Sequence, residues 1–250
     1  MITYEQPLNE KIRLFLRIEL LVKRLTDHIE KASQADTLAA LTILLELYNL
    51  SSRIDLKSDV IKDLDRMHQA IRRAIEHGQQ QEAVLGELKQ HTERMHQLRG
   101  SLGQHMRNHI FFSSLRQRTS LPGGLNGSDI PLLNHWLEQD AETRKADLLS
   151  WGESFTITAH AASYILDLIR SYCEGTSRVA KEGFFQMSLG MNKTYQLLMV
   201  ELPDDCDVYP EISAGKQRFS LRFVEADMLS AERGKQRQAD IEFYLKLCAF

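Results

Sequence analysis

The sequence has few of the residues that mark disulfide-bonded and zinc-binding proteins. Its 250 residues include only three cysteines and five prolines. Cys173, Cys206 and Cys248 are odd in number and far apart, and no Cys-x-x-Cys pair is present. This spacing argues against a disulfide framework and against a zinc site, and it fits a reducing compartment. We therefore expect a cytoplasmic protein that binds no metal.

Long apolar runs are missing as well. The first seven residues are polar and lack the apolar segment of a signal peptide. The most apolar stretch, 38–50, is interrupted by Thr42, Glu46 and Asn49, and it is too short to cross a bilayer. No membrane span is predicted.

Neither sign of charge dominates. The formal net charge is −3, and apolar residues at 43% and charged residues at 26% are typical of a soluble globular protein. A protein that binds nucleic acid in bulk usually has a strongly basic domain, so no nucleic-acid partner is expected. Any basic binding site must be local.

Motifs of catalysis and phosphate binding are also missing. The chain contains no Gly-x-Ser-x-Gly and no His-Glu-x-x-His sequence. The glycine-rich stretch 122–127 lacks the Gly-Lys-Ser/Thr ending of a phosphate loop. His105 and His109 have the spacing of one helix face, but no acidic or cysteine ligand stands near them, so we interpret them as surface residues. The sequence predicts no cofactor, no catalytic residue and no enzyme.

The first two-thirds of the chain have helical periodicity. Apolar spacing predicts an α-helical domain over 7–175, with Asn9 as the first N-cap and Asp129 as a cap-like residue ahead of Pro131. The expected helices are 9–29, 35–50, 57–77, 81–102, 111–120, 132–138, 141–151 and 155–173. The third and fourth should form a long antiparallel hairpin. The first is apolar over a wide arc, which indicates packing on two sides, in a core or in a subunit interface.

After Gly175 the apolar period changes from 3.6 to 2. This change predicts a β-strand domain over 176–250, with strands at 183–189, 195–202, 216–224 and 241–248. Short links between them imply an antiparallel sheet, and residues 1–6 are expected to add an edge strand. The predicted fold class is therefore α+β, a helical body followed by an antiparallel β-rich module.

The strand predicted at 216–224 has a basic side. Alternation turns Phe219, Leu221 and Phe223 to one face and Lys216, Arg218, Ser220 and Arg222 to the other. One interpretation is an ordinary solvated outer face, and the other is a docking surface for an acidic, extended ligand. A platform that stacks bases is disfavoured, because it needs aromatic and basic side chains on the same face.

Three stretches of the chain resemble one family. Residues 4–19 begin Tyr-Glu-Gln-Pro-Leu-Asn-Glu-Lys, and residues 116–124 read Arg-Gln-Arg-Thr-Ser-Leu-Pro-Gly-Gly, followed by Asp129-x-Pro131 and Trp136-Leu137. Residues 209–213, Tyr-Pro-Glu-Ile-Ser, lead into the basic strand. In this order the stretches resemble the ZapD family, bacterial cell-division proteins that associate with the FtsZ ring.

The resemblance implies a non-enzymatic homodimer with an α-helical and a β-strand domain. It implies binding to the C-terminal tail of FtsZ, a tubulin-like GTPase, and cross-linking of FtsZ filaments into bundles at the mid-cell division site. The basic contact positions carried over from the family are Arg116, Arg218 and Arg222, and Lys216 and Arg118 complete the predicted site. We expect Arg116 to lie near the strand, in one basic cleft. The alternative is an adaptor of the same fold that binds a different acidic peptide.

One stretch departs from the family pattern. Asn126, Ser128 and Asn134 stand where the family carries a cysteine, a phenylalanine and a histidine, although His135 lies next to the last. The stretch from Gly124 to Trp136 is therefore left out of the predicted site.

Overall fold

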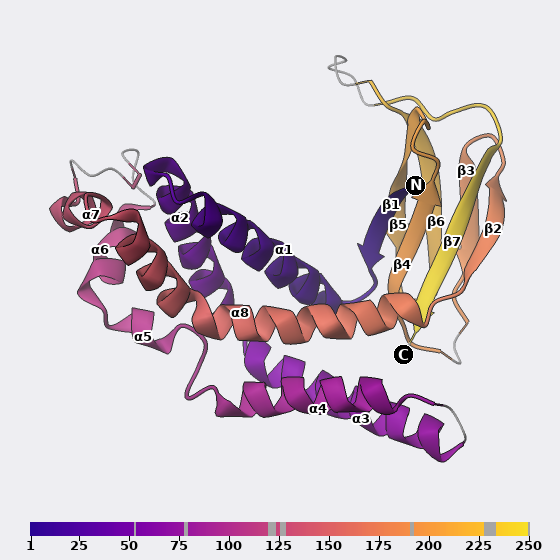
Figure 1. Ribbon diagram of the computed structural model, residues 1–250. Helices are drawn as coiled ribbons and strands as arrows, with labels where there is room; N and C mark the ends of the chain where they lie inside the picture. Colours follow the sequence, from indigo (N-terminus) through magenta and orange to yellow (C-terminus); the bar gives the residue numbers. More distant parts are fainter. Residues whose placement is uncertain are drawn as a thin grey trace. The chain divides into compact units, whose positions relative to one another are not determined.

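The computed structural model describes residues 1–52, 54–77, 80–119, 124–125, 129–190, 193–227 and 234–249. It has the predicted α+β fold (Figure 1). Its helices are α1 (Glu10–Lys31), α2 (Gln34–Ser51), α3 (Leu56–Glu76), α4 (Glu82–Gln97), α5 (Gln104–Arg107), α6 (Ile110–Arg118), α7 (Pro131–Leu137) and α8 (Ala141–Ser171). Its strands are β1 (Ile2–Pro7), β2 (Gly175–Ala180), β3 (Phe184–Ser188), β4 (Tyr195–Leu202), β5 (Val208–Ala214), β6 (Arg218–Glu225) and β7 (Ile241–Ala249).

The chain divides into two units. A β-strand unit comprises Met1–Arg13 and Leu166–Phe250, and a helical unit comprises Leu14–Ile165. The division falls inside α1 and α8, whereas the change from helix to strand along the chain comes at Gly175, where β2 begins.

Helix α1 begins where the sequence predicts. The Asn9 side chain accepts a hydrogen bond from the Ile12 N–H at 2.9 Å, which is the N-cap interaction. The helix buries the wide apolar arc expected of it. The buried side chains include Ile12, Phe15, Ile18, Leu21, Val22, Leu25 and Ile29. The predicted hairpin is also confirmed, because α3 and α4 pack along each other with Leu64, Met67, Leu88 and Met95 buried.

Helix α8 is longer than expected. The sequence predicts two helices with a break near Gly152, but the structure has one helix over Ala141–Ser171. A glycine inside a helix costs roughly 1 kcal/mol relative to alanine. Here it permits close packing, since a Cβ at Gly152 would lie 3.3 Å from Leu25 Cδ2 of α1.

Two other helical expectations need correction. The apolar seam over 81–102 does not form one helix, because α4 ends at Gln97 and Gly100 and Gly103 follow with φ of 68° and 66°. His105 then lies in α5 and His109 precedes α6, so they do not share one helix. Asp129 does not cap α7. Pro131 is at the start of that helix, so the N-cap position belongs to Ile130.

The β-strand unit is a sandwich of two antiparallel sheets with strand orders β1-β4-β7-β2 and β3-β6-β5. The first sheet includes the predicted N-terminal edge strand, which pairs Ile2–Pro7 with Leu202–Leu197 of β4. Alternate residues of β4, β6 and β7 fill the core between the sheets, among them Leu198, Val200, Phe219, Leu221, Phe223, Phe243 and Leu245. The Phe185 and Phe243 rings, 5.3 Å apart, join β3 to β7 across it.

Two strands were not predicted. In β2 every residue except Ala180 is exposed, so no alternation marks it. In β5 the residue Pro210 argues against a strand, but β5 is an edge strand, where a residue without an N–H is tolerated. Strand β6 begins at Arg218 rather than Lys216, because Gly215 N–H donates to the Arg218 carbonyl at 2.9 Å and closes a turn.

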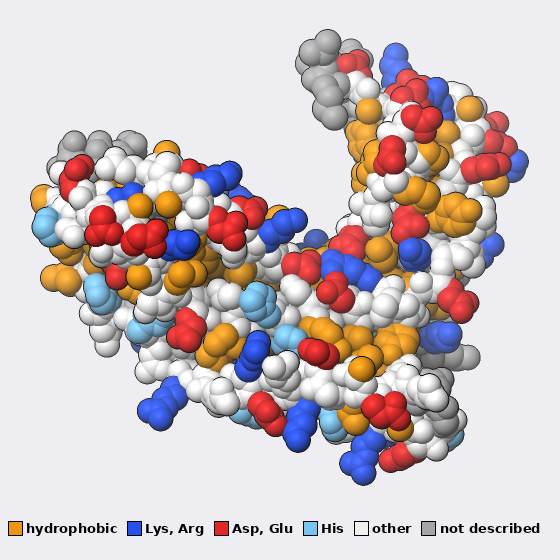
Figure 2. Space-filling model, in the orientation of Figure 1, with side chains coloured by type: hydrophobic (Ala, Val, Ile, Leu, Met, Phe, Trp, Pro, Cys, Tyr) orange, Lys and Arg blue, Asp and Glu red, His pale blue; other side chains and the backbone are white. Residues whose placement is uncertain are grey.

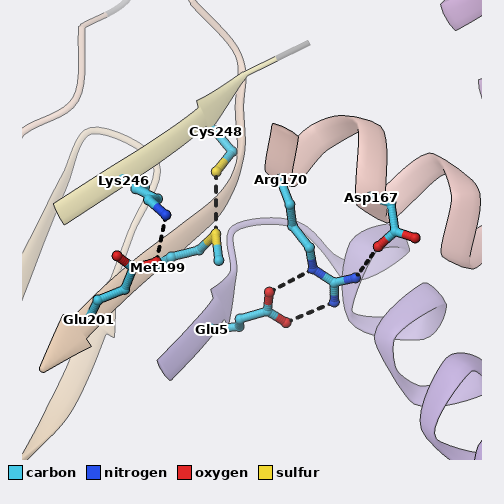
Figure 3. A network of polar contacts seen from close by, with 7 residues as sticks. All are labelled: Glu5, Asp167, Arg170, Met199, Glu201, Lys246 and Cys248. Carbon is cyan, nitrogen blue, oxygen red and sulfur yellow. Dashed lines mark hydrogen bonds and ion pairs between the residues drawn. The ribbon is translucent and has the colours of Figure 1, made fainter. Parts of the chain in front are cut away.

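The outer side of the first sheet carries paired charges (Figure 3). Arg170, near the end of α8, contacts both carboxylate oxygens of Glu5 in β1, at 2.8 and 3.0 Å, and also binds Asp167 at 3.0 Å. Lys246 of β7 pairs with Glu201 of β4 at 2.5 Å. These cations are therefore engaged within the unit.

Candidate functional site

The outward face of the β3-β6-β5 sheet carries the predicted basic residues. Phe219, Leu221 and Phe223 of β6 are almost fully buried, with exposed fractions of 1%, 0% and 0%. The intervening Arg218, Ser220 and Arg222 are therefore on the other face, as the alternation predicts.

Strand register defines what surrounds each of these residues. Arg222 lies between Phe184 of β3 and Glu211 of β5. Ser220 lies between Gln186 and Ser213, and Arg218 pairs with Ser188. Across the strands, the row through Arg222 is charged, the row through Ser220 is polar and neutral, and in the row through Arg218 the arginine is paired with Ser188.

Arg222 has a carboxylate partner that the sequence reading missed. Its Nη2 lies 2.8 Å and its Nε 3.0 Å from Glu211 Oε2, and each side chain is 31% exposed. Glu211 stands in the quoted Tyr-Pro-Glu-Ile-Ser stretch, but its position beside Arg222 depends on β5, which was not recognised as a strand. The basic face therefore contains one acid.

Arg218 and Lys216 are both exposed, and neither makes an ion pair with any residue that the structure describes. Lys216 lies in the turn between β5 and β6. Arg218 borders a concavity of about 290 Å³, which we call the face concavity. It is lined by Gln186, Ser213, Ala214, Gly215, Arg218, Phe219 and Ser220. The face concavity thus combines one free guanidinium with hydroxyl and amide groups.

Arg116 and Arg118 lie on α6, in the helical unit. Arg116 is half-buried, and its two terminal nitrogens donate to the carbonyls of Met106 and Arg107, both at 2.9 Å. Its guanidinium carbon also lies 4.8 Å from the centre of the Tyr48 ring. Arg118 is exposed and has no partner among the described residues. Arg116 thus supports the end of α5, and Arg118 is free.

Comparison with known proteins now adds to this geometry. The profile of the ZapD family, described as a cell division protein, matches residues 16–222. The cell division protein ZapD of Chromobacterium violaceum is 35% identical over 254 aligned residues, covering 100% of each chain. The ZapD of Methylococcus capsulatus is 34% identical, covering 99% of this chain and 98% of its own.

The chain belongs to the ZapD family. It therefore has a role in cell division. The profile match extends through both units and includes all five residues of the predicted basic site, Arg116, Arg118, Lys216, Arg218 and Arg222.

The structure describes only part of the stretch from Gly124 to Trp136, which departs from the family pattern. Asn126 and Ser128 lie outside the described residues, and Asn134 lies on α7. Beside α7 the helical unit has an apolar concavity of about 370 Å³, whose lining includes Phe111, Trp136 and Trp151. The Trp136 indole donates to Asp147 at 2.9 Å. The rings of Phe111, Trp136 and Trp151 pack against one another, and this cluster was not part of the predicted site.

The face of the protein drawn in Figure 2 is mixed in charge. On the face seen in Figure 2, basic and acidic side chains are interspersed over both units. Among the described residues, no group of three or more histidines, cysteines and acids is arranged to hold a metal ion. No helix in the described part of the chain is both long and apolar enough to cross a membrane.

Proposed function

We propose that this ZapD-family protein binds the acidic C-terminal tail of FtsZ on the outward face of β6 and, as a homodimer, cross-links FtsZ filaments. The observation that carries the proposal is Arg218, which lies beside the face concavity and has no ion pair with a described residue, with Arg222 four residues further along the strand. A planar guanidinium binds a carboxylate through two parallel hydrogen bonds, which suits an acidic peptide.

The Arg222–Glu211 pair is compatible with this role. A partly exposed ion pair contributes only about 0–1 kcal/mol, so an incoming carboxylate can share or replace Glu211 at little cost. Ser213 and Ser220 border the face concavity and offer hydroxyl groups to the peptide backbone. The exposed Phe184 beside Arg222 offers an apolar contact.

Cross-linking follows from two such sites in one dimer. Two tails engaged by one dimer hold two filaments together, and the second contact is intramolecular once the first has formed. The proposed activity is mechanical and needs no catalytic group or cofactor, and the proposed location is the cytoplasmic side of the division site. Of the two predicted residues on α6, Arg116 donates to the carbonyls of Met106 and Arg107, and Arg118 is exposed, so Arg118 is the one available to a ligand.

Charge reversal on β6 tests the proposal. Arg218→Glu and Arg222→Glu should each weaken binding of a fluorescein-labelled FtsZ tail peptide about tenfold or more, because a charge-assisted contact becomes repulsive. Fluorescence anisotropy measures the affinity, and circular dichroism checks the fold. Lys235→Glu is the matched control, since Lys235 is exposed in the same unit and has no ion pair with a described residue.

Unchanged binding by both arginine variants would show that the face is an ordinary solvated surface. Arg118→Glu is measured in parallel, because the exposed Arg118 side chain makes no hydrogen bond or ion pair with a described residue. If Arg118→Glu binds like the wild type, Arg118 is not part of the site. If a different acidic peptide binds and the FtsZ tail does not, the protein is an adaptor for another partner.

A further inference from the structure

The strands β2 and β3 separate from each other although they are consecutive in the chain. They are joined by the short turn 181–183, yet β2 belongs to one sheet and β3 to the other. Each is the last strand of its sheet, so within the described residues neither has a strand on its outer side. The sandwich is therefore open along this side, between two strand edges.

A concavity of about 430 Å³, which we call the edge cleft, lies on this open side. Thr176 and Arg178 of β2, Met187 of β3 and Leu247 of β7 line it, together with Lys193. Leu245, also in the lining, is 2% exposed, so the bottom of the cleft reaches the core. The edge cleft thus has an apolar bottom and two basic side chains.

Shared lining residues connect the edge cleft, through a neighbouring concavity, to the face concavity beside Arg218. A third concavity, of about 380 Å³, lies between them and includes Lys216. It shares Gly215 with the face concavity and shares Lys193 and Tyr195 with the edge cleft. The three concavities are therefore neighbours, and together we call them the groove: it extends from the outward face of β6, past the β5–β6 turn, to the edges of β2 and β3.

The groove gathers cations that have no ion pair with a described residue, whereas several cations elsewhere in the unit are paired. Four cations line it, and none has an ion pair with a described residue: Arg218, Lys216, Lys193 and Arg178. The acid that lines it is Glu174. Elsewhere in the same unit, Lys181, Arg237, Arg170 and Lys246 each pair with a carboxylate. Clustered unpaired cations repel one another, and an anionic ligand relieves this repulsion.

We propose that this groove is the full binding path of the acidic tail, and that the edge cleft takes an apolar side chain of the peptide while Arg178 and Lys193 bind its carboxylates. The proposal deepens the function proposed above and rests on it. Extended peptides bind exposed strand edges through main-chain hydrogen bonds, and pockets for alternate side chains give specificity. The free edges of β2 and β3 offer those main-chain groups, and the apolar bottom offers the pocket.

Charge reversal at the distal end of the groove tests the path. With the full-length protein and the labelled FtsZ tail peptide, Arg178→Glu and Lys193→Glu should each weaken binding about tenfold. Lys235→Glu should leave binding unchanged. Binding of both groove variants at wild-type affinity would overturn the proposal.

A position-specific probe separates contact from long-range electrostatics. A photo-crosslinking amino acid replaces Thr176, which lines the edge cleft, or Ser177, whose side chain is on the opposite face of β2. The peptide should crosslink at position 176 and not at position 177. Equal crosslinking at both positions, or none at either, would contradict the proposed path.

The two proposals fail in different ways. If the wild-type protein does not bind the tail peptide, the proposed function and the path are both wrong. If the wild type binds and only Arg218→Glu and Arg222→Glu weaken binding, the function stands and the path ends at β6. Tail peptides with serine in place of their apolar residues complete the test, because they should bind more weakly only if the edge cleft holds an apolar side chain.

Discussion

At the scale of single residues, the cations of the β-strand unit differ in what they contact. Arg222 pairs with Glu211 of the neighbouring strand β5, while Arg218, four residues away on β6, has no ion pair with a described residue. The same strand face therefore contains one arginine held in position by an acid and one that is free to bind. Removing the acid should therefore change peptide binding through Arg222 and not through Arg218.

Glu211→Gln should strengthen binding of the FtsZ tail peptide severalfold. The substitution removes the negative charge on the basic face and leaves Arg222 available to the carboxylates of the peptide. Anisotropy titration at low and physiological salt measures the change, which should shrink as salt screens the charges. Glu201→Gln is the matched control, because Glu201 pairs with Lys246 on the other sheet. Weaker binding by Glu211→Gln would show that the pair is needed to orient Arg222.

Cys173, which follows α8, and Cys248 of β7 give a pH-dependent prediction for stability. Burial raises the pKa of the Cys173 and Cys248 thiols above their ordinary value of 9.0. The folded state therefore keeps both thiols neutral, while the unfolded chain releases their protons near pH 9. Their contribution to the free energy of unfolding is complete below that pH and is lost as the pH rises above it.

Urea denaturation at about pH 8 and about pH 10 measures this loss. Cys248→Ala should show a smaller decrease in the free energy of unfolding between the two pH values than the wild type, because the variant lacks one of the titrating groups. An equal decrease in both proteins would contradict the account.

At the scale of elements, the sequence predicts most helices and the strongly alternating strands, and the errors have physical causes. Strand β2 buries one residue of six, so periodicity cannot reveal it. Strand β5 contains Pro210, whose effect depends on whether the strand is at an edge. Helix α8 continues through Gly152 because its neighbours α1 and α2 pack against that residue.

The candidate site was predictable to the same extent. Alternation alone turns Arg218 and Arg222 outward. The partner of Arg222 depends on β5, which Pro210 disguises, and the edge cleft beside Arg178 depends on β2, which has no alternation, so both required the structure. Arg116 was predicted from the family, and its hydrogen bonds to the end of α5 come from a turn that the sequence pattern does not reveal.

Arg144 of α8 holds several elements of the helical unit together. It is only 7% exposed, and it donates to the carbonyls of Ala32, Leu137 and Gln139, which lie just after α1, at the end of α7 and just before α8. Arg144→Met should lower the free energy of unfolding by at least about 2 kcal/mol, because buried carbonyls lose their donors. Chemical denaturation checks this, with the exposed Arg24→Met as control. A loss similar to that of the control would be inconsistent with this role.

At the scale of the whole molecule, the account depends on two properties acting together. One is a groove for an acidic peptide in the β-strand unit, and the other is the presence of two copies of that groove in one dimer. A monomer would bind the tail without joining filaments. Sedimentation-equilibrium centrifugation measures the oligomeric state, and the proposed cross-linking requires a dimer at the concentrations at which bundling occurs.

The most direct test of the central claim is the assembly of FtsZ with GTP in the presence and absence of this protein. Right-angle light scattering and pelleting are compared for full-length and tail-deleted FtsZ. The account predicts that the protein increases scattering and co-pellets with full-length filaments, and does neither with the tail-deleted form. Equal bundling of both forms, or no effect on either, would contradict it.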